Sequence, residues 1–252
     1  MRRDPLPSSR TGGTGCGQRV REEANISTLA KVPLFQKLSP EEIRQLEGLA
    51  KPKQFPKGTA VFMQDDPSDS LYVVVSGSSK VFQTSEDGKA QVLNTIGPGE
   101  AFGELAMIEG RPRTATVETL EKSEMLALSR KDFEDFAAKH PQVLWKLLAS
   151  LSERVRHYME STLDLAFRDV PYRLLRVMQQ LLQRHGVAEG DGRRIGLSLS
   201  VGELASMVGA TPDTVGRLLD RYEKDGLIRR AGENWLVPDP RALDKALEYA
   251  AQ

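Results

Sequence analysis

Short runs of apolar and β-branched residues, separated by turn residues, fill the chain between about residues 53 and 129. Gly58, Gly77 and the Gly97-Pro98-Gly99 group are among the turns. The pattern predicts strands at Ala60–Met63, Leu71–Val75, Lys80–Gln83, Gln91–Ile96, Thr114–Val117 and Glu124–Leu128. Many short strands at such spacing favour a sandwich or a jelly-roll-like barrel.

Amphipathic helices are predicted on both sides of this β-rich segment. Ser39, Pro40 and Glu42 make a capping-box start for a helix that ends near Ala50. A brief helix is expected at Lys131–Ala138.

A long helix is predicted to begin at Pro141 and to end before the Asp169-Val170-Pro171 break. Its apolar positions follow the heptad spacing of a coiled coil: Leu144, Leu148, Leu151, Val155, Tyr158, Thr162 and Leu165. Such a stripe more often packs on the helix's own domain. Because this helix stands between two domains, where a second chain can cover it, we favour a two-chain coiled coil and hence a homodimer.

Two short helices are predicted further on, after a helix through Leu174–Leu182 and a loop from Gly186 to Gly192. A capping box at Ser200 opens the first, and Gly209 ends it. Thr211 caps the second. Two such helices joined by a glycine, the second with a polar N-terminal face, have the geometry that lets a helix enter the DNA major groove.

A β-hairpin wing is predicted after Gly226, in the run Leu227–Val237. Each basic residue in this region is by itself more often solvated than specific. As a group beside a capped helix pair they favour DNA: Arg221, Lys224, Arg229 and Arg230. The competing interpretation is a small helical subdomain whose charges only face solvent.

Composition limits the classes of partner. Hydrophobic residues make up 39% of the chain, and no apolar run approaches the roughly 18 residues that a membrane span needs. Lys and Arg total 35, as do Asp and Glu, so a nucleic-acid contact requires a local patch. The single cysteine, Cys16, cannot form an intramolecular disulfide, which fits a cytoplasmic protein. Residues 1–24 are expected to form a disordered tail.

The sequence from about Leu29 to Ala242 resembles the Crp/Fnr family of transcription regulators. The likeness rests on "VVVSGSSKVF", "GPGEAFGELAMIEGRPRTATV", "DLAFRDVPYRLL" and "LSVGELASMVGATPDTVGRLLDRYEKDGLI", in this order. It implies an α+β fold with a jelly-roll-like cyclic-nucleotide-binding β-roll at residues 25–139, a dimerisation helix at 140–168 and a winged helix-turn-helix at 169–252. It also implies an allosteric, non-enzymatic regulator that binds double-stranded DNA and engages RNA polymerase.

A nucleotide site is expected around residues 103–114. Gly103 lets backbone approach a ligand, and a short helix starting there aims N–H groups at an anion. Arg113 can hold a phosphate through two charge-assisted bonds, Thr114 offers a hydroxyl and an N–H, and Glu104 suits a ribose 2′-hydroxyl. The resemblance puts Glu104, Arg113 and Thr114 on the family's ribose and phosphate positions, and we include Leu105 in the site. Alternatively, Arg113 and Glu104 pair with each other on the surface.

The identity of the effector stays open at this point. Members of the family that respond to cyclic AMP place small hydroxyl or amide residues on the long helix to meet adenine, where this chain has Tyr158 and Met159. Three options remain: cyclic AMP with a different base contact, another nucleotide, or a degenerate site. Because Tyr158 is also a heptad position, an effector touching it would act on helix packing and thereby on the DNA-binding domains.

The resemblance assigns the DNA contacts to the second short helix. Its expected DNA-binding residues are Thr211, Pro212, Asp213, Thr214, Arg217 and Arg221, with Ser200 near a phosphate. Members that read a TGTGA-type half-site carry arginine and glutamate where this chain has Pro212 and Asp213. Pro212 cannot hydrogen-bond a base edge, so Arg217 is the candidate for base readout. We expect inverted half-sites about 34–36 Å apart, or a multiple of that spacing, but of a different sequence.

Three other classes of protein compete with this interpretation. A cupin-like metalloenzyme usually needs several imidazoles, and His140, His157 and His185 all lie outside the predicted barrel. One cysteine excludes an iron–sulfur sensor, and a haem sensor lacks an obvious barrel ligand. A constitutive regulator with a degenerate pocket stays open. We therefore expect no catalytic residue and no metal site.

Overall fold

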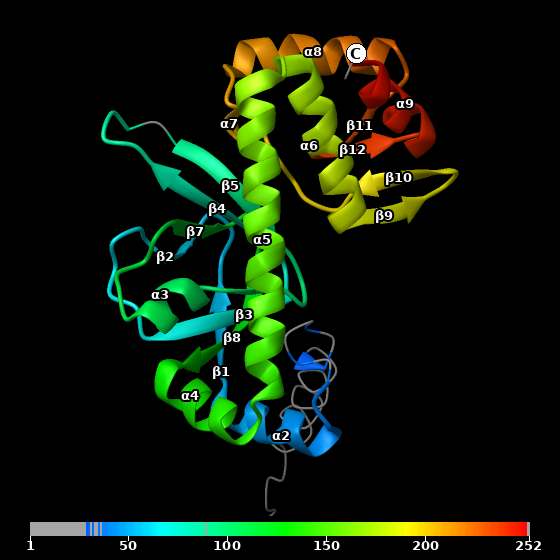
Figure 1. The fold of residues 1–252 in the computed structure, drawn as a ribbon. Coiled ribbons are helices and arrows are strands. Elements are labelled where there is room, and N and C mark those ends of the chain that lie inside the picture. The colour runs from blue at the N-terminus through cyan, green and yellow to red at the C-terminus, as the bar shows by residue number, and fades with distance from the viewer. Residues whose placement is uncertain (1–28, 31, 33–34, 36, 89, 251–252) are drawn as a thin grey trace, which may run out of the picture.

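The computed structural model describes residues 29–250 except 31, 33–34, 36 and 89. The expected tail at residues 1–24 and Cys16 lie outside the described residues. The chain forms a β-rich body, a long helix beside it and a smaller C-terminal body (Figure 1). This mixed architecture confirms the α+β class expected from the sequence.

Two four-stranded antiparallel sheets build the β-rich body, in the orders β1-β8-β3-β6 and β2-β7-β4-β5. Their side chains meet in a buried cluster that includes Val74, Phe102 and Met125. The strands are β1 (Lys51–Phe55), β2 (Ala60–Phe62), β3 (Ser70–Ser76), β4 (Ser79–Thr84), β5 (Ala90–Ile96), β6 (Ala101–Phe102), β7 (Thr116–Thr119) and β8 (Ser123–Ser129).

All six predicted strands are present, and two further strands were missed. The sequence of β1, Lys51–Phe55, is polar and contains Pro52, and four of its five residues are exposed, so it carries no apolar alternation. It is held by antiparallel pairing with β8. The other missed strand, β6, has only two residues.

Helices cover the ends of the β-rich body: α2 (Pro40–Leu49), α3 (Glu104–Glu109) and α4 (Arg130–Lys139). The capping box predicted for α2 is present, since the Ser39 N–H donates to Glu42 Oε2 at 2.6 Å and the Glu42 N–H donates to Ser39 Oγ at 3.3 Å. The glycine-started helix expected after Gly103 is α3. A second buried cluster packs α2, α4 and the start of the long helix against β3 and β8.

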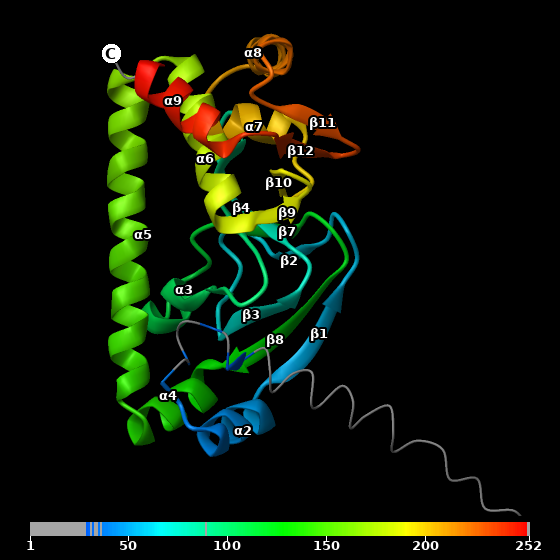
Figure 2. The ribbon, with the colours of Figure 1, turned by 90° about the vertical axis from the view of Figure 1, so that its right-hand side faces the viewer.

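The long helix, α5 (Gln142–Phe167), runs along one side of the molecule (Figure 2). Val143 and Leu147 near its start are buried against the β-rich body. The heptad positions form a different stripe, which is exposed in this single chain except for the half-buried Leu151. The helix therefore has one face on its own body and a second apolar face without cover among the described residues.

The C-terminal body consists of α6 (Val170–His185), β9 (Gly186–Glu189), β10 (Gly192–Ile195), α7 (Val201–Val208), α8 (Pro212–Lys224), β11 (Arg229–Ala231), β12 (Asn234–Val237) and α9 (Pro240–Ala250). The prediction of a loop from Gly186 to Gly192 is wrong. Those residues form a β9–β10 hairpin, which turns at Gly190 with a φ of +60° and continues the wing sheet in the order β11-β12-β10-β9. Because three of the four residues of β9 are exposed, no apolar pattern marked it.

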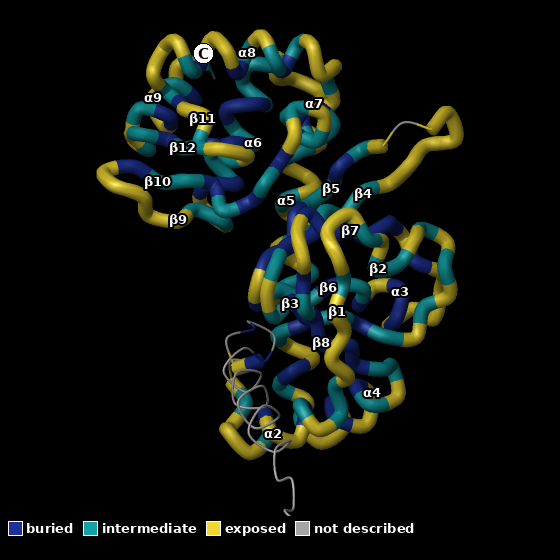
Figure 3. Tube along the Cα trace, turned by 180° about the vertical axis from the view of Figure 1, so that it is seen from behind, coloured by how far each residue is buried: buried dark blue, intermediate teal, exposed yellow. Residues whose placement is uncertain are grey.

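The two bodies contact each other through α6 and α7. Lys80 on β4 donates to Glu203 at 2.8 Å and pairs with Glu118 at 2.9 Å. Ser206 of α7 bonds to the backbone of β5, with its Oγ accepting from the Val92 N–H at 2.8 Å. On the far side of the C-terminal body, α8 presents exposed residues outward (Figure 3).

Candidate effector cavity and DNA interface

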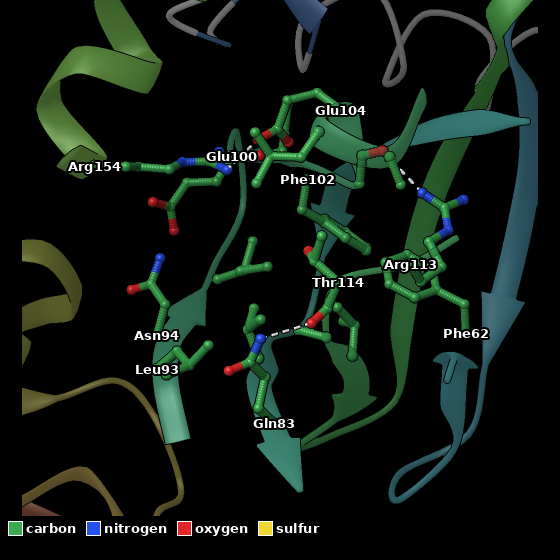
Figure 4. A pocket seen from close by; sticks show the side chains of 18 of the residues that line it. Phe62, Gln83, Leu93, Asn94, Glu100, Phe102, Glu104, Arg113, Thr114 and Arg154 are labelled. Carbon is green, nitrogen blue, oxygen red and sulfur yellow. Dashed lines mark hydrogen bonds and ion pairs between the residues drawn. The ribbon is translucent and has the colours of Figure 1, made fainter. Parts of the chain in front are cut away.

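A cavity of about 350 Å³ lies in the β-rich body between β4, β5, α3 and the inner face of α5. Its size falls in the range of small-molecule sites. Apolar side chains such as Val81, Phe102 and Val117 form much of its wall. The polar side chains come from separate elements, and Figure 4 shows Arg113 on one side of the cavity and Asn94 on the other.

Arg113 is buried at the cavity wall, with 3% of its surface exposed. Its Nη1 donates to the Gly103 carbonyl and its Nη2 to the Ser70 carbonyl, each at 2.8 Å. Its Nε is buried without a partner, and no carboxylate of the described residues forms an ion pair with it. The guanidinium lies 4.0 Å from the centre of the Phe62 ring. Burial lowers the pKa of Arg113, so an anion bound here would compensate for lost hydration.

Glu104 is also buried, at 2% exposure, and its partner is Arg154. Arg154 Nη1 donates to Glu104 Oε1 at 2.6 Å, and its Nη2 donates to the Ala101 carbonyl at 2.6 Å (Figure 4). Glu104 Oε2 has no partner in the part of the chain that the structure describes. The alternative in which Glu104 pairs with Arg113 is therefore wrong, because Arg154 holds the carboxylate in place.

Gly103 precedes α3 in a backbone conformation that favours glycine. Its φ is +80°, and a Cβ there would lie 2.6 Å from Arg113 Nη1. Any side chain would thus displace the arginine from the cavity wall as well as strain the turn.

The remaining expected effector residues fall into two groups. Leu105, Thr114 and Tyr158 line the cavity. Met159, the next residue on α5, does not line it and is 64% exposed, because one helical residue turns the side chain by about 100°. The structure thus brings six of the seven expected residues to one cavity.

Several cavity residues were not foreseen. Arg154, Gln83, Asn94 and Glu100 all line the wall. The available signal for Arg154 was its place four residues before Tyr158, one turn along the same side of the helix. Asn94 and Glu100 gave no such signal.

The two short helices form the predicted helix-turn-helix. Ser200 and Glu203 make the capping box of α7, and the Thr211 side chain caps α8 by accepting from the Thr214 N–H at 3.3 Å. Burial favours a raised pKa for Glu203, but hydrogen bonds from Lys80 and Ser200 outweigh it and lower the pKa. The carboxylate therefore stays charged where the two bodies meet.

The expected DNA-contacting side chains gather on the outer face of α8. Thr211, Pro212, Asp213, Arg217 and Arg221 are exposed, and Thr214 is half-buried. Ser200 is exposed at the start of α7.

Ion pairs and ring contacts hold some of these arginines. Arg217 pairs with Asp213 one turn earlier. On the wing, the Arg230 guanidinium lies 5.0 Å from the centre of the Trp235 ring. Arg217 and Arg230 are thus positioned by neighbours and still accessible to a polyanion.

No helix among the described residues is long and apolar enough to span a membrane. The same residues contain no cluster of three or more histidine, cysteine, aspartate or glutamate side chains placed to hold a metal.

Two family models match most of the chain. The "Cyclic nucleotide-binding domain" model matches residues 52–140, and the "Crp-like helix-turn-helix domain" model matches residues 173–246. The first contains the cavity except for the residues of α5, and the second contains α7, α8 and the wing.

Curated relatives share this combination. The chain is 34% identical to the "CRP-like cAMP-activated global transcriptional regulator" of Mycobacterium tuberculosis, over 85% of this chain and 96% of the relative. It is 32% identical to the "Cyclic AMP receptor protein" of Thermus thermophilus, over 78% of this chain and 88% of the relative.

Solved structures also superpose on the model. The c-di-GMP-responsive global regulator CLP of Xanthomonas campestris matches with a TM-score of 0.69 and 26% identity, over 80% of this chain and 100% of that chain. FixK2 of Bradyrhizobium japonicum matches with a TM-score of 0.70 over 78% of this chain and 96% of that chain, and at 22% identity it shows the fold alone.

These matches are to DNA-binding transcription regulators and not to enzymes. They confirm the resemblance found in the sequence. The chain belongs to the Crp/Fnr family of transcription regulators, with a cyclic nucleotide-binding domain before a Crp-like helix-turn-helix.

Proposed function

We propose that the chain is a homodimeric regulator that binds cyclic AMP in the cavity and inverted-repeat DNA through α8. The observation that carries the effector assignment is a pair of buried, unpartnered polar atoms, Arg113 Nε and Glu104 Oε2, on residues that line one cavity. Buried polar atoms are normally hydrogen-bonded, so two unpartnered polar atoms at one site favour a polar ligand there. A cation and a carboxylate that do not pair with each other suit a ligand with one anionic and one hydroxyl group.

A cyclic nucleotide meets both demands. We assign its phosphate to Arg113 and Thr114, because a guanidinium with spare donors binds phosphate oxygens well. We assign its ribose hydroxyl to Glu104 Oε2, which can only accept while the carboxylate is charged. The relatives described as cAMP-activated support adenine as the base.

Dimerisation is supported by the uncovered stripe on α5. Large apolar side chains at Leu148, Val155 and Tyr158 are between 41% and 56% exposed. A contiguous apolar helix face with heptad spacing suits a second copy of the same helix. We propose residues 140–168 as the dimerisation segment, between an effector domain at 25–139 and a DNA-binding domain at 169–252.

DNA recognition is assigned to α8 and the wing. A dimer presents two copies of α8, which suits inverted half-sites about 34–36 Å apart or a multiple of that distance. We place Arg217 at a base edge, and Ser200 and Arg221 at phosphates. Because a transcription regulator acts on the chromosome, we also propose a cytoplasmic location and RNA polymerase as a partner.

Isothermal titration of the full chain with cyclic AMP, cyclic GMP and c-di-GMP tests the effector. We expect cyclic AMP to bind most tightly and to strengthen salt-sensitive retention of a duplex library by the protein. The rival function is an effector-independent regulator with a degenerate pocket, which Tyr158 and Met159 favour because they depart from the residues expected at the base. Retention of DNA without binding of any of the three nucleotides would establish that rival.

A further inference from the structure

Asn94 on β5 lines the cavity, and the oxygen of its side-chain amide already accepts hydrogen bonds. Its Oδ1 accepts from Arg184 Nη1 at 2.6 Å and from the Thr95 N–H at 2.9 Å. Both partners can only donate, so the oxygen must face them and Nδ2 must face away. Nδ2 has no acceptor within the described chain. Figure 4 shows it turned toward Glu100 and Arg154, so the cavity contains a free donor at this place.

The guanidinium that fixes this amide belongs to the C-terminal body. Arg184 lies near the end of α6, and its Nη2 is held by Glu100 Oε1 at 2.6 Å and by the Thr95 carbonyl at 3.4 Å. Glu100 is in turn fixed, because its Oε2 accepts from the Gly97 N–H at 2.7 Å. The orientation of a side chain in the effector cavity is therefore set by a residue of the DNA-binding side.

The place of Asn94 in the cavity determines what it can meet. In the proposed complex Arg113 and Glu104 take the phosphate and the ribose. Asn94 lies across the cavity from Arg113 (Figure 4). Its neighbours in the wall include Val81, Leu93 and Ile96, which offer no side-chain hydrogen bond. A base directed away from the phosphate would therefore find the Asn94 donor between these apolar side chains and the Glu100 carboxylate.

We propose that Asn94 is a specificity-determining residue whose Nδ2 donates to a ring nitrogen of adenine, and that Arg184 is the positioning residue that keeps the amide in this orientation. The inference rests on the proposed binding of cyclic AMP. Adenine carries ring acceptors at N1, N3 and N7. N3 lies on the edge beside the ribose, so a base directed away from the ribose offers this donor N1 or N7, and one donor suffices to select between those two edges. This contact would replace the one that small polar residues on α5 were expected to supply, where this chain has Tyr158 and Met159.

Titration of the full chain with cyclic AMP and its 1-deaza and 7-deaza analogues tests the contact, because each analogue lacks one ring acceptor. We expect the wild type to bind one analogue about 5- to 50-fold more weakly than cyclic AMP and the other about equally. Asn94→Asp keeps the size and the Arg184 contact but removes the donor. It should weaken cyclic AMP by a similar factor and bind both analogues alike, and Asn94→Ala should do the same.

Gln64→Glu is the matched control, since it adds the same charge to the β-rich body outside the cavity and keeps the acceptor for the Thr84 N–H. It should bind like the wild type. Equal binding of cyclic AMP and both analogues by the wild type, or an Asn94→Asp affinity within twofold of the wild type, would overturn the inference and leave the proposed function standing. Failure of the wild type to bind cyclic AMP would overturn both.

Arg184→Met tests the positioning role separately. Without the guanidinium the amide can rotate, so the ratio of the two analogue affinities should shrink toward one while cyclic AMP still binds. A residue that only supports the fold would lower all three affinities together. An unchanged ratio would overturn the role of Arg184.

Discussion

Arg154 of α5 and Glu104 of α3 are joined by an ion pair of 2.6 Å at the cavity wall. The carboxylate is almost fully buried, whereas the guanidinium keeps 29% of its side-chain surface exposed. The long helix is thereby tied to the element that carries the proposed ribose contact. An effector that engages Glu104 must act on the same carboxylate that anchors α5.

Arg154→Met is expected to destabilise the chain. It leaves the buried Glu104 carboxylate without its cation, which should cost about 1–3 kcal/mol of the free energy of unfolding. Adding Glu104→Gln removes the stranded charge, so the double variant should recover most of that loss. Urea unfolding of the wild type and the two variants measures this, and an Arg154→Met variant as stable as the wild type would show that solvent already screens the pair.

Arg113→Lys is expected to weaken cyclic AMP binding by about 10- to 100-fold, because a lysine cannot keep both backbone carbonyl contacts and present further donors to a phosphate. Arg111→Lys is the matched control, since that side chain is 78% exposed and lies outside the cavity. Calorimetric titration compares them. Equal losses in the two variants would point to a general effect of replacing an arginine and not to a phosphate contact of Arg113.

Leu148→Asp combined with Val155→Asp should convert the proposed dimer to a monomer, because two carboxylates would be buried at the seam. Glu153→Lys changes a charge two residues from both Leu151 and Val155, on the opposite side of the helix, and should leave the dimer intact. Analytical ultracentrifugation at micromolar concentration gives the masses. A wild type that sediments as a monomer would refute the seam.

Arg217→Ala should relax base preference at one position in each half-site, with a loss of about 1–3 kcal/mol of discrimination. Arg221→Ala should instead weaken binding to all sequences and reduce the salt dependence. Selection from a random duplex library, followed by titration at several salt concentrations, separates the two. Uniform weakening by Arg217→Ala would assign that residue to a phosphate.

Stability is expected to fall as the pH drops below about 6.5. His185 is half-buried where the bodies meet, with its Nε2 3.1 Å from Thr95 Oγ1, and its partial burial lowers its pKa. Burial also lowers the pKa of His157. Since the unfolded chain binds these protons more readily than the folded one, the stability present above pH 6.5 is lost as the pH falls toward the folded-state pKa values. Melting temperatures between pH 5 and pH 8 measure the effect.

His185→Gln should remove part of this dependence and leave the contribution of His157. A variant whose melting temperature follows the wild-type pH curve throughout would exclude His185 as a source.

Local hydrogen bonds explain why parts of the fold were predictable. The side chains of Ser39, Ser200 and Thr211 each accept from the backbone N–H three residues later. Four consecutive residues therefore suffice to predict where each of these helices begins. The β9–β10 hairpin lacked that advantage. The exposed strand β9 is stabilised by pairing with β10, a partner that is itself paired with β12.

The candidate site was predictable where the chemistry is contiguous. Gly103, Glu104, Arg113 and Thr114 lie within 12 residues, and the resemblance covers them as one motif. Arg154 joins Glu104 from 50 positions away, and Arg184 joins Asn94 from 90 positions away. Such contacts depend on how α5 and α6 are placed against the β-rich body, which no local pattern specifies.

The bonds of Ser206 to β5 have a further consequence, because β5 is the edge strand of its sheet. Ser206 Oγ accepts from Val92 and donates to the Ala90 carbonyl at 2.6 Å, and Gln91 Nε2 donates to the Ser206 carbonyl at 2.5 Å. If α7 leaves this position, unpaired backbone groups of β5 become a template for strand addition by another molecule. Helix α7 thus covers an exposed sheet edge, and variants that loosen it are expected to aggregate sooner by strand pairing.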